Sequence, residues 1–131
     1  MTGNTILIIE DNLLNLELAA DLLESHGFVV ASALTAEEGL RCARALQPDL
    51  VLMDFSLPGM DGLSATRNLK ADPATRHLIV VGLTANAMKG DEQTALAAGC
   101  DGYLTKPIDT HSFIGAVTKF IASANGNINK N

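Results

Sequence analysis

The chain has 131 residues, of which 47% are hydrophobic and 18% charged, and its formal net charge is −6 at pH 7. This balance is ordinary for one globular domain and excludes a largely disordered chain, and the acidity argues against nucleic-acid partners, which need a basic patch. No apolar run approaches the length of a membrane span and no signal peptide precedes the first strand, so we expect a cytoplasmic protein without membrane contact.

Short aliphatic runs alternate along the chain with stretches of helical periodicity. The predicted strands are 6–9, 28–30, 50–53, 78–81 and a segment near 103–104. Three of them, the first, third and fourth, are continuous apolar runs rather than alternating ones. Continuous runs are typical of strands that are buried on both faces of a parallel sheet.

Helices are predicted between and after these strands, over 13–26, 35–46, 61 or 62 to 72, and 86–98, with a fifth capped by Asp109. Gly27 and Gly99 are natural stops for the first and fourth helices. A capping box formed by Thr35 and Glu38 opens the second helix. We assign residues 1–123 to the domain and expect the polar segment 124–131 to be a disordered tail.

The order of elements, a strand followed by a helix five times over, predicts an α/β fold. We expect a doubly wound, five-stranded parallel sheet of order 2-1-3-4-5 with helices on both faces, as in flavodoxin-like proteins. Such sheets bind ligands outside the carboxyl ends of their strands, where the strand order reverses. The residues that end the strands are therefore the candidates for a functional site.

Acidic residues end two of the predicted strands. Glu10 and Asp11 follow the first strand and Asp54 ends the third, and these strands flank the reversal. Two unit charges a few ångströms apart repel by on the order of 1–4 kcal/mol near a protein surface. A hard divalent cation relieves that repulsion, and Mg²⁺, with Mn²⁺ as an alternative, favours oxygen ligands of this kind.

A hydroxyl and an ammonium group complete the set, since Thr84 ends the fourth strand and Lys106 the fifth. The combination indicates phosphoryl chemistry, because a carboxylate can accept a phosphoryl group as an acyl phosphate. Lys106 and a divalent cation can neutralise the charge on that group, and the Thr84 hydroxyl can donate a hydrogen bond to it. Asp54, on the central strand, is the candidate acceptor.

These residues, together with the loop 58–62 and the pairs Thr84-Ala85 and Lys106-Pro107, stand in the order and spacing of a known family. The sequence resembles a response-regulator receiver domain of two-component signalling over about residues 5–123. Within that family it is similar to stand-alone regulators of bacterial cell polarity and division and to the receivers of hybrid histidine kinases.

The resemblance implies a role for each member of the acidic cluster. Asp54 would be phosphorylated by a histidine kinase or a histidine phosphotransfer protein, and Lys106 would pair with the phosphoryl group. Mg²⁺ would be held by Asp11, Asp54 and the backbone carbonyl of Ser56, with Glu10 acting through water. The domain would catalyse its own phosphorylation and slow dephosphorylation, without being a turnover enzyme on external substrates.

The same resemblance implies further positions around the site. Ser56 and Asn86 would tune the phosphoryl lifetime, and the Lys106–Pro107 peptide bond would be cis. On phosphorylation Thr84 would move toward the new group, and an aromatic side chain on the fifth strand would turn into the space released. That aromatic residue is Tyr103, the only tyrosine of the chain.

The resemblance also implies surfaces for partners. The signal would pass through the fourth helix, fifth strand and fifth helix to a protein effector, with the domain a monomer or a weak phosphorylation-dependent dimer. The predicted partner-contacting residues are Leu14, Asn15, Leu18, Met88, Tyr103 and Pro107.

Two alternatives for the function remain at this level. A flavodoxin-like ligand-binding module shares the fold, but it needs a phosphate loop rich in serine, threonine and glycine, whereas residues 10–13 are acidic and free of glycine. A receiver that binds partners without being phosphorylated is the other, and the complete set of acids argues against it. An aspartyl phosphatase is disfavoured because Ser56 stands where its second acid would be.

Overall fold

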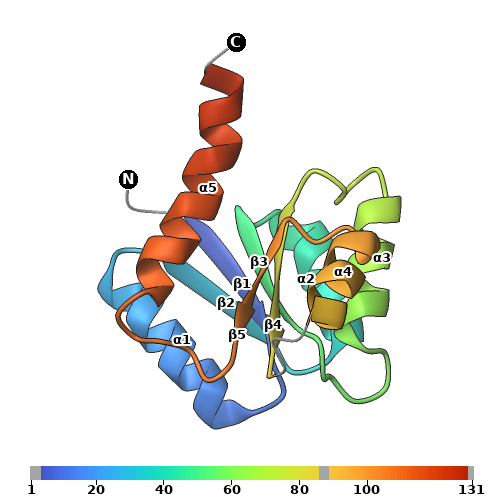
Figure 1. Ribbon diagram of the computed structural model, residues 1–131, viewed down its shortest axis with the longest axis horizontal. Helices are drawn as coiled ribbons and strands as arrows, with labels where there is room; N and C mark the ends of the chain where they lie inside the picture. The colour runs from blue at the N-terminus through green and yellow to red at the C-terminus, as the bar shows by residue number, and fades with distance from the viewer. Residues whose placement is uncertain (1–3, 86–88, 130–131) are drawn as a thin grey trace.

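The computed structural model of the chain describes residues 4–85 and 89–129, in which a parallel sheet is covered by helices on both faces (Figure 1). The strand order is β2-β1-β3-β4-β5, which confirms the predicted order 2-1-3-4-5. The strands are β1 (Thr5–Ile9), β2 (Val29–Ala33), β3 (Leu50–Asp54), β4 (Ile79–Thr84) and β5 (Gly102–Thr105). The helices are α1 (Leu13–Ser25), α2 (Ala36–Leu46), α3 (Gly62–Ala71), α4 (Lys89–Ala98) and α5 (Phe113–Asn129).

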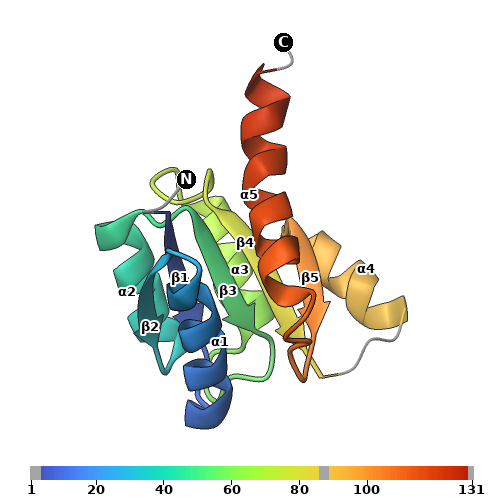
Figure 2. The same ribbon diagram turned by 90° about the vertical axis from the view of Figure 1, so that its left-hand side faces the viewer.

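Each face of the sheet has its own apolar core. Side chains such as Leu7 and Met53 pack against α2, α3 and α4, while their neighbours Ile8 and Leu52 pack against α1 and α5. Figure 2 shows α1 and α5 together in front of the sheet. Successive residues of a strand point to opposite faces, so a strand that is buried on both faces is apolar along its length. β1 is buried and apolar from Ile6 to Ile9, and β3 from Leu50 to Met53.

The first three helices begin at polar residues that cap them. The side-chain oxygen of Asn12 accepts a hydrogen bond from the N–H of Asn15, and that of Thr35 accepts one from the N–H of Glu38. Asp61 caps α3 in the same way. These caps satisfy donors that have no partner within the helix, and they confirm the predicted starts of α2 and α3.

The structure differs from the prediction at the end of the chain. Asp109 starts the turn before α5, since its carbonyl accepts from the N–H of Phe113, but the helix then continues to Asn129 instead of giving way to a disordered tail at residue 124. The polar composition of this segment does not prevent helix formation, because it contains no proline and a packed helix propagates at little cost. The last turns of α5 project beyond the sheet (Figures 1 and 2).

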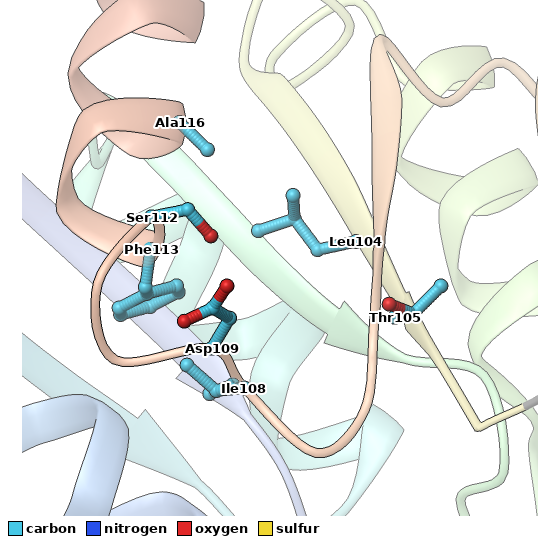
Figure 3. A pocket seen from close by; sticks show the side chains of 7 residues that line it. All are labelled: Leu104, Thr105, Ile108, Asp109, Ser112, Phe113 and Ala116. Atoms are coloured by element: carbon cyan, nitrogen blue, oxygen red, sulfur yellow. The ribbon is translucent and has the colours of Figure 1, made fainter.

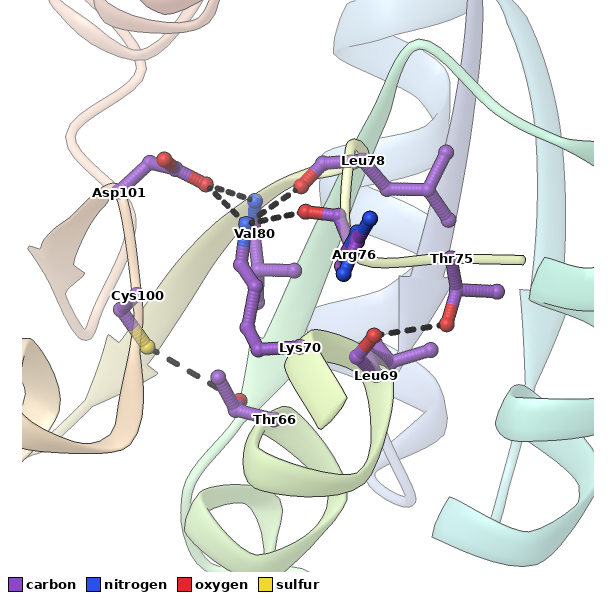
Figure 4. A network of polar contacts seen from close by, with 9 residues as sticks. All are labelled: Thr66, Leu69, Lys70, Thr75, Arg76, Leu78, Val80, Cys100 and Asp101. Carbon is purple, nitrogen blue, oxygen red and sulfur yellow. Dashed lines mark hydrogen bonds and ion pairs between the residues drawn. The ribbon is translucent and has the colours of Figure 1, made fainter. Parts of the chain in front are cut away.

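A lysine near the end of α3 connects three parts of the fold, as Figure 4 shows. The Nζ of Lys70 donates to the carbonyl of Leu78 at 2.7 Å and lies 3.0 Å from Oδ2 of Asp101. The same carboxylate oxygen accepts the N–H of Val80 at 2.8 Å. Lys70 therefore holds the start of β4 and the loop between α4 and β5 against α3, at the edge of the sheet away from the strand-end acids.

No helix in the described part of the chain is long and apolar enough to cross a membrane.

We expect Lys70→Met to lower the free energy of unfolding by about 1–3 kcal/mol, because the Leu78 carbonyl and the Asp101 carboxylate lose a charged donor. Urea unfolding followed by circular dichroism measures this change. Lys119→Met is the control, since Lys119 is exposed on α5. A Lys70→Met protein as stable as this control would show that the contacts of Lys70 contribute little.

Candidate functional site

Three carboxylates meet where β1 and β3 end. One oxygen from each of Glu10, Asp11 and Asp54 lies within 4.8 Å of the others. Glu10 and Asp54 are each 1% exposed, whereas Asp11 is exposed. The cluster thus has a buried floor and a rim open to solvent, at the reversal of strand order where the sequence places it.

Lys106 lies against the two buried acids. Its Nζ is 3.3 Å from Oε1 of Glu10 and 3.3 Å from Oδ2 of Asp54. Burial favours the neutral amine, but the negative charges of Asp54 and Glu10 and their hydrogen bonds outweigh it, so the pKa of Lys106 lies above its usual value. The ammonium group therefore stays charged and offsets part of the negative charge of the cluster.

The carboxyl group of Glu10 titrates far from its usual range. Its pKa is raised to about 7, chiefly because burial penalises the charged form, and its hydrogen bond with Asp54 adds to this effect. The backbone N–H of Asn12, which donates to Oε2 of Glu10 at 3.2 Å, and the charge of Lys106 act in the opposite direction without cancelling the shift. Near neutral pH, Glu10 is thus poised between its two protonation states.

The loop after β3 is held closely to Asp54. The N–H of Ser56 donates to Oδ1 of Asp54 at 3.0 Å. Gly62, the first residue of α3, packs directly on this segment, and a Cβ there would overlap the carbonyl oxygen of Asp54. The hydrogen bond from Ser56 to Asp54 places the Ser56 backbone beside the acid cluster, where the family resemblance implies a metal-binding role for its carbonyl.

The remaining strand ends lie on the other side of Asp54. Thr84 is 4% exposed and pairs with Thr105 in the ladder between β4 and β5. Its carbonyl accepts the N–H of Lys106 at 2.7 Å, and the Lys106–Pro107 bond is cis, as the resemblance implied. Asn86, assigned to lifetime tuning, lies outside the described residues.

The predicted partner-contacting residues fall in two places. Leu14 and Leu18 are 78% and 39% exposed, one turn apart on α1, which begins just after Asp11. Pro107 is exposed beside Lys106, and Tyr103 is half-buried on β5. Asn15 is half-buried on α1, and Met88 is outside the described residues.

The sequence did not indicate a small pocket between β5 and α5, beside the Lys106–Pro107 bond. Figure 3 shows Leu104, Ile108 and Phe113 lining it together with polar groups. The other lining residues are Thr105, Asp109, Ser112 and Ala116. The pocket arises where the loop folds back to start α5, and no sequence motif marks that geometry.

The acid cluster fits a hard divalent cation. All of its donors are carboxylate oxygens, the kind of ligand that Mg²⁺ and Ca²⁺ prefer. Three carboxylates face the single ammonium group of Lys106, so a cation would relieve repulsion that the protein leaves uncompensated when all of them are ionised.

Comparison with known proteins gives a consistent result. The family model described as the response regulator receiver domain matches residues 6–118. The chain is 41% identical over 120 residues to the polar-differentiation response regulator DivK of Brucella ovis, covering 92% of this chain and 98% of that protein.

Two solved structures bear on the site and its partners. The receiver domain of sensor histidine kinase PA1611 from Pseudomonas aeruginosa has a magnesium ion in its active site cleft. It matches with a TM-score of 0.84 and 35% identity over 92% of this chain and 99% of that one. The second structure is the receiver domain of Ssk1 from Saccharomyces cerevisiae in complex with the histidine phosphotransfer protein Ypd1. It matches with a TM-score of 0.84 and 26% identity, over 92% of this chain and 90% of that one.

We expect the stability of the metal-free protein to fall as the pH rises from about 4.5 to about 7. The unfolded chain releases the Glu10 proton near pH 4.5, whereas the folded protein holds it up to about pH 7. Below this window Glu10 is protonated in both the folded and the unfolded state. Above it Glu10 is ionised in both, and the stability that the bound proton contributed to the folded state is lost. Glu10→Gln removes the effect, so the wild type should lose up to about 3 kcal/mol relative to this variant across the window.

Urea unfolding in EDTA at a series of pH values measures the difference. Glu17→Gln is the matched control, because Glu17 is exposed on α1. The stability of this control should depend on pH as that of the wild type does. If the stability of Glu10→Gln showed the same pH dependence, the buried carboxyl group would not be its source.

Proposed function

The chain belongs to the response regulator receiver domain family, and on this premise we propose that Asp54 is the residue that receives the phosphoryl group. The domain is a phosphoaccepting module of two-component signalling. The observation that carries the assignment is the position of Asp54, which is buried between Glu10, Asp11 and the ammonium group of Lys106. No other acid among the described residues lies within ion-pair distance of Lys106 apart from Glu10, which is a neighbour of Asp54 in the same cluster.

The transfer consists of one bond made and one bond broken. An oxygen of Asp54 forms a bond to phosphorus while the bond from phosphorus to the donor's histidine nitrogen breaks, and the imidazole leaves with the electron pair. Lys106 is placed to pair with a phosphoryl oxygen, because its Nζ is already 3.3 Å from Oδ2 of Asp54. Its raised pKa keeps the ammonium group charged throughout.

Mg²⁺ would be held by Asp11, Asp54 and the carbonyl of Ser56, with Glu10 acting through water. When bound, the ion supplies positive charge that offsets the carboxylates and the phosphoryl oxygens. The carboxylate oxygens within 4.8 Å of one another support this ligand set, and the magnesium ion of the PA1611 receiver supports the choice of metal. Mn²⁺ would bind the same oxygens.

The response to phosphorylation would begin at Thr84, whose hydroxyl donates to the phosphoryl group, and continue to Tyr103 on the neighbouring strand. The surface formed by α4, β5 and α5 would then change its affinity for a protein effector. Ser56 is exposed next to Asp54 and, with Asn86, would set how readily water reaches the acyl phosphate.

The phosphodonor would be a histidine kinase or a histidine phosphotransfer protein. Leu14 and Leu18 are exposed on α1, which follows Asp11 in the chain, and Pro107 is exposed next to Lys106; they would offer an apolar surface for a donor helix. The complex of the Ssk1 receiver with Ypd1 supports a donor of this class. We place the domain in the cytoplasm, as a monomer or weak phosphorylation-dependent dimer that does not turn over external substrates.

We expect the wild type to gain one labile phosphoryl group when incubated with acetyl phosphate and Mg²⁺, and Asp54→Asn to gain none. The amide of asparagine is not a nucleophile that forms an acyl phosphate. Intact-mass spectrometry reads out the gain, EDTA should abolish it, and Asp21→Asn, an exposed acid on α1, should retain it.

A folded wild type that gained no phosphoryl group would favour a receiver that binds partners without phosphorylation. A gain in Asp54→Asn equal to that of the wild type would place the acceptor elsewhere.

We expect Lys106→Ala to bind Mg²⁺ at least as tightly as the wild type, and up to several-fold more tightly, because a competing cation has left the acid cluster. The phosphorylated variant should fail to transmit the switch. Calorimetric titration with Mg²⁺ measures the first effect, and phosphorylation-dependent amide shifts in α4 and β5 measure the second. Lys119→Ala is the control, and wild-type amide shifts in Lys106→Ala would contradict the role assigned to Lys106.

A further inference from the structure

The ring of Phe55 occupies the space that a side chain at position 82 would fill. A Cβ placed on Gly82 would overlap the tip of this ring, with three of the ring's carbon atoms as its nearest neighbours. The ring can reach the surface of β4 only because residue 82 is a glycine. Phe55 and Gly82 thus form a matched pair, an aromatic ring seated over a strand position without a side chain.

This seat lies next to Tyr103. In the sheet, Gly82 is in register with Met53 on β3 and with Tyr103 on β5. Residues in register on neighbouring parallel strands point to the same face, and Met53 belongs to the core beneath α2, α3 and α4. Tyr103 therefore points to that face as well, and the Phe55 ring lies on the sheet between these two side chains.

Thr84 projects on the same face, since it is two residues beyond Gly82 on β4. The ring consequently lies beside both residues to which the proposed function assigns the switch. On this face the ring therefore covers the strand position next to Tyr103, on the side toward β3.

Phe55 is also bound closely to the acceptor. It follows Asp54 directly, and its N–H donates to the carbonyl of Leu83 at 3.0 Å. A Cβ on Gly62 would lie 2.9 Å from the Cα of Phe55, so α3 confines this residue from the other side. A displacement of the backbone after Asp54 must therefore move the ring over Gly82.

We propose that Phe55 is a positioning residue that couples the state of Asp54 to the position of Tyr103 through its seat on Gly82. The inference rests on the proposed function, which makes Asp54 the acceptor and Tyr103 the responding side chain. Charge and bulk added at Asp54 displace the adjoining backbone, the ring moves with it, and the packing over Gly82, next to Tyr103, changes in turn.

The experiment uses the single tyrosine of the chain as its reporter. Protein labelled with 3-fluorotyrosine gives one fluorine resonance from Tyr103, which is recorded with Mg²⁺ before and after acetyl phosphate. Intact mass is measured on the same samples. In the wild type the resonance should move when the phosphoryl group is gained.

Phe55→Ala should gain the phosphoryl group to the same extent, yet the movement of its resonance should fall to less than half of the wild-type value. Phe55→Leu, which keeps an apolar side chain of reduced size, should retain more of the movement than Phe55→Ala. If Phe55 only stabilised the fold, Phe55→Ala would not keep the full phosphoryl gain while losing most of the shift of the tyrosine resonance.

The seat itself is tested by thermal unfolding. Gly82→Ala should lower the Tm by at least about 3 °C, because the new Cβ displaces the ring. The double variant Phe55→Ala with Gly82→Ala should recover most of that loss. Gly115→Ala is the matched control, since a Cβ at this position of α5 would meet no neighbouring atom within 4 Å among the described residues.

The outcomes separate this inference from the proposed function. A phosphoryl gain with an undiminished fluorine shift in Phe55→Ala would overturn the coupling role of Phe55 and leave the proposed function standing. A wild type that gains no phosphoryl group would overturn the proposed function, and the coupling with it. Gly82→Ala as stable as Gly115→Ala would overturn the seat from which the coupling is argued.

Discussion

The ammonium group of Lys106, placed between the buried carboxylates of Glu10 and Asp54, is the interaction on which the site depends. Burial raises the free energy of each charged carboxylate, and their mutual repulsion adds to it, so neither is tolerated at the floor of the site without a positive partner. Lys106 supplies one positive charge, which offsets only part of the negative charge of the three carboxylates. Burial chiefly raises the pKa of Glu10, and the negative charge that Lys106 leaves uncompensated suits the site to a divalent cation.

In the parallel sheet, the residues that stabilise the fold lie on the two faces, and the residues of the acid cluster lie at the carboxyl ends of the strands. Both faces of the central strands are apolar and covered by helices, so the polar residues collect at the carboxyl edge, where the strands end and helices begin. The opposite edge has a different polar network, in which Lys70 holds the start of β4 and the α4–β5 loop. This network lies at the end of β4 opposite the one that carries Thr84.

The contact between Phe55 and Gly82 gives this arrangement a path from the acceptor to the switch face. The ring of Phe55 lies directly over the backbone of Gly82, and Gly62 at the start of α3 packs against the Phe55 backbone. In the proposed coupling, this contact passes movement at the end of β3 to β4 and β5. The coupling depends on two residues 27 positions apart whose side chains fit only as a pair.

The sequence by itself determined the elements and the residues of the acid cluster, because apolar runs, caps such as Thr35, and strand-end residues are local signals. The fivefold alternation of strand and helix indicated the fold class and with it the strand order. The fold class placed Lys106 beside the acids, but the sequence did not determine the burial of Glu10 or its direct hydrogen bond with Lys106. These two residues are 96 positions apart and meet only when the sheet forms. Nor did the sequence show that Phe55 fills the space above Gly82, since nothing in the sequence around a strand glycine indicates which side chain covers it. The sequence also did not predict the full length of α5, because helix propagation into a polar segment depends on the packed turns that precede it.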